Sequence, residues 1–501
     1  MNSTRRRMLA AIGAGTAVTL LGSSATAAGA SDRAIVHPAD DAAGVIDALR
    51  SVGGEVLLEY EHFDFVVARL PAGVRDELES DTRVDLVEED ALAMATPAAD
   101  GIDSIDGDDT VRESFGGALG DRIGDGALDG TPIDDIVGGD DGDEDDASCL
   151  LHPPQAPSWG WERIGADRAG GDGSGVSLAI LDTGIETGHC DLDVAGGRNF
   201  TGVDGSDYED RNGHGTHCAG IAAALDNDVG VVGVAPGVDP YAVKVLADDG
   251  TGFHSWIAAG IDWCLSNGIE ILSLSLGSGS GSVALDAAIE RAHAEGHLLV
   301  ASAGNEGNDS ADSCAAETMT YPATHEDVLA VTAMDRDETL AAYSSVGSAV
   351  DLMAPGSNVR STDVNGSYSY QSGTSMACPF VAGAAALAWT DVGAGPGPND
   401  EVRATLSETA EEVHGTCAEG DGLVNAAGLG TGSGGGGDGD SGSGGSSGGS
   451  DGGNGGSGSD GGGSTGSNGI GDGIAGLVDG LFSRLRSWLG RLLDWLSWSF
   501  G

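Results

Sequence analysis

The pattern of apolar and polar positions predicts a small folded unit over residues 31–97. A short apolar run at 34–36 is typical of a buried strand, and residues 42–52 carry Val45, Leu49 and Val52 at helical spacing. Alternating strand patterns follow between 55 and 70, then a short helix at 74–78 and a last strand at 84–94. This order predicts an α+β unit.

A larger region over residues 151–430 alternates short apolar runs with helix-length segments. The runs at 176–181, 239–246, 270–276 and 298–303 predict buried strands. Strands that alternate with helices pair in parallel, so we expect an α/β fold with a doubly wound, mostly parallel sheet and flanking helices. The region is long enough to bury its own core.

The segments at 98–150 and 431–469 lack the apolar residues that a core requires. Between 100 and 148 there are 17 acidic residues and two arginines among many glycines. Such a composition predicts a disordered, cleavable junction. A calcium-binding role for its acidic run at 140–146 is the alternative, but the spacing fits no EF-hand. Residues 431–469 contain only Gly, Ser, Asp, Thr and Asn, which predicts a flexible linker.

The two ends of the chain carry further apolar segments. Arg5, Arg6 and Arg7 precede an apolar run at 9–21 and an A-x-A-like cleavage site at 25–27, so residues 1–30 predict a signal peptide. The adjacent arginines favour the twin-arginine type, and the alternatives are an ordinary secretory signal or a retained anchor. We therefore expect a secreted, extracellular protein.

The tail at 470–501 predicts an amphipathic helix with Arg484, Arg486 and Arg491 and three tryptophans. Such a tail is a candidate for contact with a membrane surface, which would associate the protein with the cell surface. Self-association or docking on the rest of the chain is the alternative, because glycines weaken the helix.

The charge balance is strongly acidic, with 80 Asp and Glu against 22 Lys and Arg, a net charge of −58. Phosphates would be repelled, so no nucleic-acid partner is expected. Lys244 is the only lysine. A lysine-poor, acidic surface stays soluble where salt screens its self-repulsion, as in proteins of extreme halophiles. A merely acidic secreted protein is the alternative.

The seven cysteines form no CxxC pair, which argues against a zinc or redox site. Their odd number leaves at least one thiol free unless it bonds to another chain. They are Cys149, Cys190, Cys218, Cys264, Cys314, Cys378 and Cys417.

Three glycine-rich segments supply the side chains that serine-dependent peptide hydrolysis requires. Asp182 ends an apolar strand, His214 opens a helix of small residues, and Ser375 opens another helix, where the local potential is positive. An Asp-Thr-Gly triplet alone would also suit an aspartic protease, but the chain has no second one.

These segments, in the order Asp, His, Ser, resemble those of subtilisin-like serine proteases, and among these the halolysins. The resemblance covers about 155–430. It implies that Asp182, His214 and Ser375 form the catalytic triad and that Asn305, in Ala303-Gly304-Asn305, stabilises the oxyanion. Polypeptide substrates would bind by strand addition. The substrate-binding residues it implies are Ser275, Leu276, Gly277, Gly250, Gly252 and Gly304.

The resemblance has three further implications. Residues 31–97 are similar to a ferredoxin-like, inhibitor-I9-type propeptide, an intramolecular inhibitor and chaperone of a self-processing zymogen. A structural calcium would be held by Gln155, Asp191, Leu225, Asn227, Val229 and Val231. Cys218 resembles the buried thiol of thiol-containing subtilases, whereas Cys378 departs from the threonine usual in the family.

Three functions are therefore compared: a general extracellular endopeptidase, a cell-surface processing protease with few substrates, and a silent binding protein that retains the fold. The complete set of catalytic residues favours the first two.

Overall fold

The computed structural model describes residues 32–95, 152–203, 205–308, 317–393, 397–414 and 418–432. All of these lie in one unit, and a second unit at 437–501 lies outside the described residues. The predictions for residues 1–30, 98–150 and 470–501, and for nearly all of 431–469, therefore concern residues that are not described, as do those for Cys149, Cys314 and Cys417.

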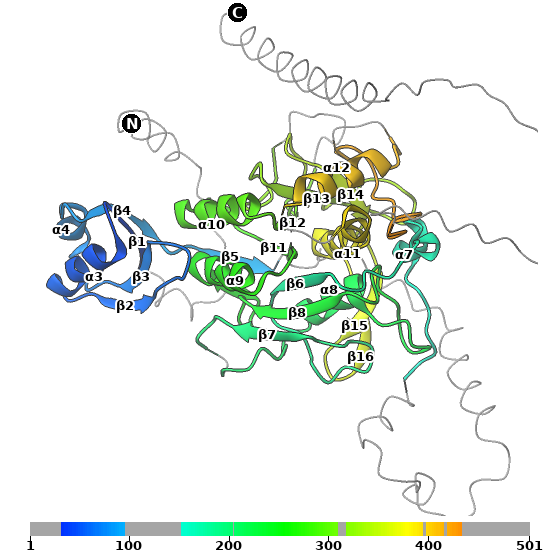
Figure 1. Ribbon diagram of the computed structural model, residues 1–501, viewed down its shortest axis with the longest axis horizontal. Helices are drawn as coiled ribbons and strands as arrows, with labels where there is room; N and C mark the ends of the chain where they lie inside the picture. The colour runs from blue at the N-terminus through cyan, green and yellow to red at the C-terminus, as the bar shows by residue number, and fades with distance from the viewer. Residues whose placement is uncertain are drawn as a thin grey trace, which may run out of the picture. The chain divides into compact units, whose positions relative to one another are not determined.

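The N-terminal segment forms a four-stranded antiparallel sheet in the order β2-β3-β1-β4. Its elements follow one another as strand, helix, strand, strand, helix, strand (Figure 1). They are β1 (Arg33–Pro38), α3 (Ala42–Ser51), β2 (Glu55–Leu58), β3 (Val66–Arg69), α4 (Arg75–Glu79) and β4 (Val84–Glu89). Asp41 caps α3 by accepting the backbone N–H of Gly44.

The single strand predicted at 84–94 is wrong, because the chain forms two strands there. β4 ends at Glu89, the Asp90 side chain turns inward to Ser255, and β5 (Leu92–Ala95) joins a different sheet. In that sheet β5 pairs antiparallel with β9 (Thr251–Phe253) and β11 (Leu276–Gly277). The break follows from burial of the Asp90 carboxylate against polar groups far along the chain.

The larger region is built on a seven-stranded sheet in the order β14-β13-β12-β10-β6-β8-β7, with every neighbouring pair parallel. Figure 1 shows β6, β8 and β7 side by side. The strands are β6 (Ser177–Asp182), β7 (Gly196–Asn199), β8 (Asp239–Lys244), β10 (Ile271–Leu274), β12 (Leu298–Ser302), β13 (Val328–Met334) and β14 (Leu352–Pro355). The parallel α/β fold expected from the sequence is confirmed.

Successive side chains of each strand pack on opposite faces of this sheet. Leu178 and Ile180 pack in the core that contains α8 (His214–Ala223), α11 (Thr374–Val392) and α12 (Asn399–Thr409). Ala179 and Leu181 pack in the other core, with α9 (His254–Asn267) and α10 (Val283–Ala294). Side chains of β1 and β3 also belong to this second core, so the N-terminal sheet packs against the same helices.

The remaining elements are α7 (Trp159–Arg163), the short 3₁₀ helix η2 (Ala166–Arg168) and the hairpin of β15 (Val359–Asp363) and β16 (Ser367–Gln371). Among the described residues, α11 alone is long and apolar enough to cross a membrane by length and composition. Its apolar side chains are buried in the protein core.

Candidate active site

Asp182 and His214 meet at the carboxyl end of the sheet. Asp182 is the last residue of β6 and is fully buried, and His214 is the first residue of α8. His214 Nδ1 lies 2.8 and 2.9 Å from the two carboxylate oxygens of Asp182. The close approach of the two segments requires glycine, because a Cβ on Gly215 would lie 2.2 Å from the carbonyl oxygen of Gly184.

The electrostatic environment of His214 favours its charged form. Burial lowers the pKa of His214, but the Asp182 carboxylate and the neighbouring Cys218 sulfur together raise that pKa well above its ordinary value. Nε2 is buried and has no hydrogen-bond partner among the described residues. One ring nitrogen is thus fixed by a carboxylate, and the other remains available for proton transfer.

Ser375 lies in the first turn of α11, where two other segments contact it. Its Oγ lies 3.3 Å from the carbonyl oxygen of Ser275, and the structure has no hydrogen bond between Ser375 Oγ and His214 Nε2. α11 starts at Thr374, in agreement with the expectation that Ser375 opens a helix, and it contains Pro379. Catalytic hydrogen bonds are often long in the absence of substrate, so this separation is compatible with proton transfer between Ser375 and His214.

Cys218 is a free, buried thiol beneath this pair, as its resemblance to the cysteine of thiol-containing subtilases implies. Its Sγ lies 3.4 Å from the carbonyl oxygen of Ser375 and 4.0 Å from His214 Nδ1. Burial raises the pKa of the Cys218 thiol, although the nearby His214 opposes that shift. A protonated thiol donates a weak hydrogen bond to the Ser375 carbonyl and is a poor nucleophile.

Two other free thiols, Cys264 and Cys378, are also buried, and Cys190 is in a disulfide. Cys378 lies in α11, and its Sγ is 3.4 Å from the carbonyl oxygen of Val300 in β12. The cysteine that replaces the usual threonine therefore retains a donor to the neighbouring strand.

Asn305 follows β12 and reaches the start of α11. Its Oδ1 accepts hydrogen bonds of 3.0 Å from the backbone N–H and the hydroxyl of Thr374. A Cβ built on Gly373 would lie 3.2 Å from Asn305 Nδ2, so the amide nitrogen faces the turn just before Ser375. Gly304 has φ of 110° and donates its N–H to Thr374 Oγ1. These bonds orient the Asn305 amide relative to Ser375.

The expected substrate groove lies between β9 and β11, and β5 fills it. Ala93 pairs with Gly252, Met94 pairs with Gly277, and Ala95 pairs with Leu276. The N–H of Ala95 donates to the carbonyl of Gly250 over 2.8 Å. A cavity of about 380 Å³ beside this strand is lined by His214, Gly250 and Gln371, among others. An extended peptide therefore already lies beside the Asp182–His214 pair.

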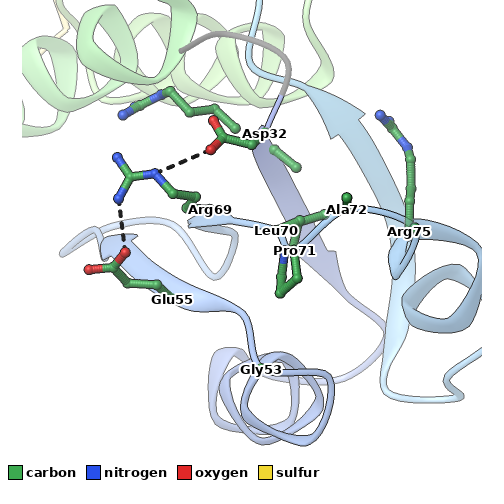
Figure 2. A pocket seen from close by; sticks show the side chains of 11 residues that line it. Asp32, Gly53, Glu55, Arg69, Leu70, Pro71, Ala72 and Arg75 are labelled. Atoms are coloured by element: carbon green, nitrogen blue, oxygen red, sulfur yellow. Dashed lines mark hydrogen bonds and ion pairs between the residues drawn. The ribbon is translucent and has the colours of Figure 1, made fainter. Parts of the chain in front are cut away.

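A second hollow, of about 520 Å³, lies in the N-terminal unit and contains no part of this arrangement. Figure 2 shows Arg69 at its edge, with ion pairs to Asp32 at 3.5 Å and to Glu55 at 2.9 Å. Of the charged residues that line it, Asp32, Glu55 and Arg69 pair with one another, whereas Arg33 pairs with Asp90 and Arg75 pairs with Glu79.

The residues expected to hold calcium surround one loop. Asp191 Oδ2 accepts the N–H of Val231, the Asp191 carbonyl accepts that of Leu225, and Gln155 Oε1 accepts that of Asn227. Asn227 Oδ1 accepts the N–H of Val229.

The donor set fits a hard cation. Asp191 Oδ1 is buried without a hydrogen-bond partner, and burial raises the pKa of Asp191 to about 6. Asn227 Oδ1 accepts one N–H and keeps a second lone pair, whereas Gln155 Oε1 accepts the N–H groups of both Asn227 and Asp228. A desolvated carboxylate with neutral oxygens around it suits calcium.

The sequence did not single out Asp210, which organises the His214 segment. One carboxylate oxygen accepts the hydroxyl of Thr183 and the N–H groups of Asn212 and Gly213. The other accepts the N–H and hydroxyl of Thr216. An Asp two residues before Asn-Gly is a turn signal that could have identified it.

Comparison with known proteins agrees with this geometry. The model of the Subtilase family (Peptidase_S8) matches residues 173–434. The chain belongs to the subtilase family. It is 44% identical over 278 residues to subtilisin DY of Bacillus licheniformis, covering 54% of this chain and 97% of that protein. Subtilisin BL of Lederbergia lenta is also 44% identical, over 281 residues that cover 54% and 98%.

Subtilisin NAT of Bacillus subtilis subsp. natto is 43% identical over 259 residues, 50% of this chain and 65% of its own length. This subtilase is a serine endopeptidase, as the sequence predicts. The matched region begins after residue 150, so the N-terminal unit and the tail lie beyond the matched family region.

Proposed function

We propose that the chain is the zymogen of a secreted, halolysin-like endopeptidase that cleaves polypeptides through an acyl-enzyme on Ser375. The observation that carries the proposal is the Asp182–His214 pair, bonded at 2.8 Å beside a groove that already binds an extended strand.

In the proposed mechanism, His214 Nε2 removes the proton from Ser375 Oγ as that oxygen attacks the substrate carbonyl. Asp182, bonded to Nδ1, holds the ring orientation and stabilises the imidazolium that forms. His214 then gives the proton to the leaving amine. In the second half, His214 removes a proton from the water that attacks the ester carbonyl, and it then gives that proton to Ser375 Oγ as the ester bond breaks.

The negative charge on the carbonyl oxygen would be stabilised by Asn305 Nδ2 and the backbone N–H of Ser375. The contacts of Asn305 Oδ1 with Thr374 support this role, because they fix the amide before any substrate binds. Loss of the equivalent donor in a subtilisin lowers kcat by about 10²–10³-fold.

Polypeptide substrates would bind as β5 does, through the backbone of Gly250, Gly252 and residues 275–277. Residues 31–97 would then act as a ferredoxin-like propeptide that inhibits its own enzyme until it is cut off. The contacts of the unit with α9 and α10 support this role. Asp90 accepts the N–H and hydroxyl of Ser255, and Glu88 accepts the N–H groups of Val283 and Ala284 at the start of α10.

The other parts of the chain would serve export and activation. We infer a twin-arginine signal peptide at 1–30, a cleavable acidic junction at 98–150, the catalytic domain at 151–430 and a linker at 431–469. The excess of acidic residues adapts the surface to high salt. Gln155, Asp191, Asn227 and the carbonyls of Leu225, Val229 and Val231 would hold a structural calcium, which would stabilise the loop without entering the reaction.

A processing protease retained at the cell surface is the alternative, favoured by the arginines and tryptophans of 470–501. Deleting this tail and fractionating cells separates the two functions. If the truncated protein distributes as the full chain does, the tail is no anchor.

Azocasein hydrolysis in several molar salt, with intact mass measured in parallel, tests the proposed function. The wild type should hydrolyse azocasein and lose its N-terminal unit, whereas Ser375→Ala should do neither. Equal hydrolysis by both proteins would refute the role of Ser375.

A further inference from the structure

Lys244 is the only lysine of the chain, and its side chain is fully buried. The other 21 basic residues counted with it are arginines. A buried ammonium is costly unless it is paired, and a lysine is out of keeping with the composition of this chain. A specific role at this position would explain both features.

The ammonium makes two hydrogen bonds, to different parts of the active site. Nζ donates to the carbonyl oxygen of Thr183 over 2.6 Å and to Asp248 Oδ1 over 2.8 Å. Lys244 ends β8 and pairs in register with Asp182 at the end of β6. It therefore joins the residue after the proposed catalytic carboxylate to the loop that follows β8.

Thr183 has each of its polar groups engaged. Its N–H donates to Asp182 Oδ1, and its hydroxyl donates to Asp210 and accepts the N–H of Gly215. The bond from Lys244 to the carbonyl fixes the remaining group, and with it the peptide plane of the turn that aims the Asp182 carboxylate.

Asp248 connects the same ammonium to the substrate groove and to the His214 segment. Its backbone carbonyl accepts Asn212 Nδ2, and Asn212 Oδ1 accepts the N–H of His214. The loop then turns at Gly250, whose carbonyl binds the β5 strand, and continues into β9. One side of the groove and both partners of the Asp182–His214 pair thus depend on one cation.

We propose that Lys244 is a positioning residue that couples the β9 side of the substrate groove to the Asp182–His214 pair. A compact ammonium suits this place, since two acceptors lie within hydrogen-bonding distance of one nitrogen. The planar guanidinium of arginine spreads its donors over three nitrogens and needs more room. The inference rests on the proposed roles of Asp182 and His214.

Kinetics of three variants, per active site titrated with a serine-reactive inhibitor, test the proposal. Lys244→Met keeps the aliphatic stem and should lower kcat and raise KM, with a loss of about 10-fold or more in kcat/KM. Asp248→Asn keeps the bond to Thr183 and should act mainly on KM. Arg291→Met removes an exposed cation of α10 that pairs with Glu295 just after the helix, and it should leave both constants unchanged.

A second measurement needs no substitution and covers the case in which Lys244→Met fails to fold. Labelling lysine with ¹⁵N at its side-chain nitrogen gives one ammonium NMR signal from the wild type, because the chain has one lysine. Covalent binding of a peptidyl boronate to the active site should shift that signal.

An ammonium signal whose chemical shift does not change when the inhibitor binds would overturn the proposal. So would a Lys244→Met enzyme that loses thermal stability but keeps the kcat and KM of the wild type per active site. If the inhibitor does not label Ser375 in the wild type, the proposed triad fails instead.

Discussion

The hydroxyl of Ser275 donates a hydrogen bond of 2.9 Å to the backbone carbonyl of Ser375. In an uninterrupted helix that carbonyl would accept the N–H of residue 379, but Pro379 has none. The proline thus leaves an acceptor beneath the proposed nucleophile, and Ser275 and Cys218 fill it. Because one helical hydrogen bond is missing, Ser275 of the groove can bond to the first turn of α11.

Replacing Ser275 with alanine should therefore reduce activity more than stability. The Ser375 carbonyl would keep only the weak thiol donor, which loosens the turn that carries Ser375. We expect a loss of about 1 kcal/mol in unfolding free energy and about 10-fold in kcat/KM. Thr332→Val is the matched control, since it removes a buried hydroxyl that donates to Ala418 elsewhere. Equal kcat/KM losses in both variants would contradict a special role for Ser275.

The pH dependence of kcat/KM should follow His214. Burial lowers the pKa of His214, but the Asp182 charge, together with the Cys218 sulfur, raises it above its ordinary value. The base must be neutral, so activity should be lost as pH falls through a value above the ordinary 6.5. Asp182→Asn removes the charge and leaves burial, so its residual activity, about 10⁴-fold lower, should persist to lower pH. An acidic limb well below pH 6.5 in the wild type would be inconsistent with this electrostatic environment.

The N-terminal unit should inhibit less well when Asp90 becomes asparagine. Asp90 is buried and pairs with Arg33 at 2.9 Å and with Ser255. Removing its charge leaves the Arg33 cation without its buried partner and weakens the contact with Ser255. Loss of one partner of such a buried charge pair costs about 2 kcal/mol or more. Activity should appear sooner after precursor cleavage than in the wild type. Asp85→Asn, on the exposed face of β4, is the control, and an unchanged delay for Asp90→Asn would count against the inhibitory role.

Calcium removal at constant ionic strength should lower the melting temperature. Binding at about 100 times Kd stabilises by about 2.7 kcal/mol, or roughly 5–10 °C for a domain of this size. Asp191→Asn should abolish the response without lowering the melting temperature of the chelated protein, because Asp191 Oδ1 is buried and unpartnered. Asp228→Asn, in the same loop but outside the expected ligand set, should still respond to calcium. A full response in Asp191→Asn would exclude this site.

The sequence predicted the parallel α/β fold and the segments of Asp182, His214, Asn305 and Ser375. Strand periodicity and glycine-rich motifs are local, so they can be recognised without knowing the fold. The resemblance to thiol-containing subtilases also located the free, buried thiol of Cys218.

What the sequence did not reveal depends on contacts between distant segments. The division of 84–94 into β4 and β5 follows from Asp90 meeting Ser255, 165 residues away. The role of Asp210 rests on five hydrogen bonds that its carboxylate accepts, and that of Lys244 rests on two hydrogen bonds to acceptors on different loops. Such polar networks have no periodicity, so only the structure shows them.

The most direct test of the proposed mechanism is to label the wild-type chain with a peptidyl phosphonate and map the adduct by mass spectrometry. Modification of Ser375 in proportion to the loss of azocasein hydrolysis is the expected result, with no adduct in Ser375→Ala. Complete inhibition with the adduct on another residue, or hydrolysis that survives full modification of Ser375, would contradict it.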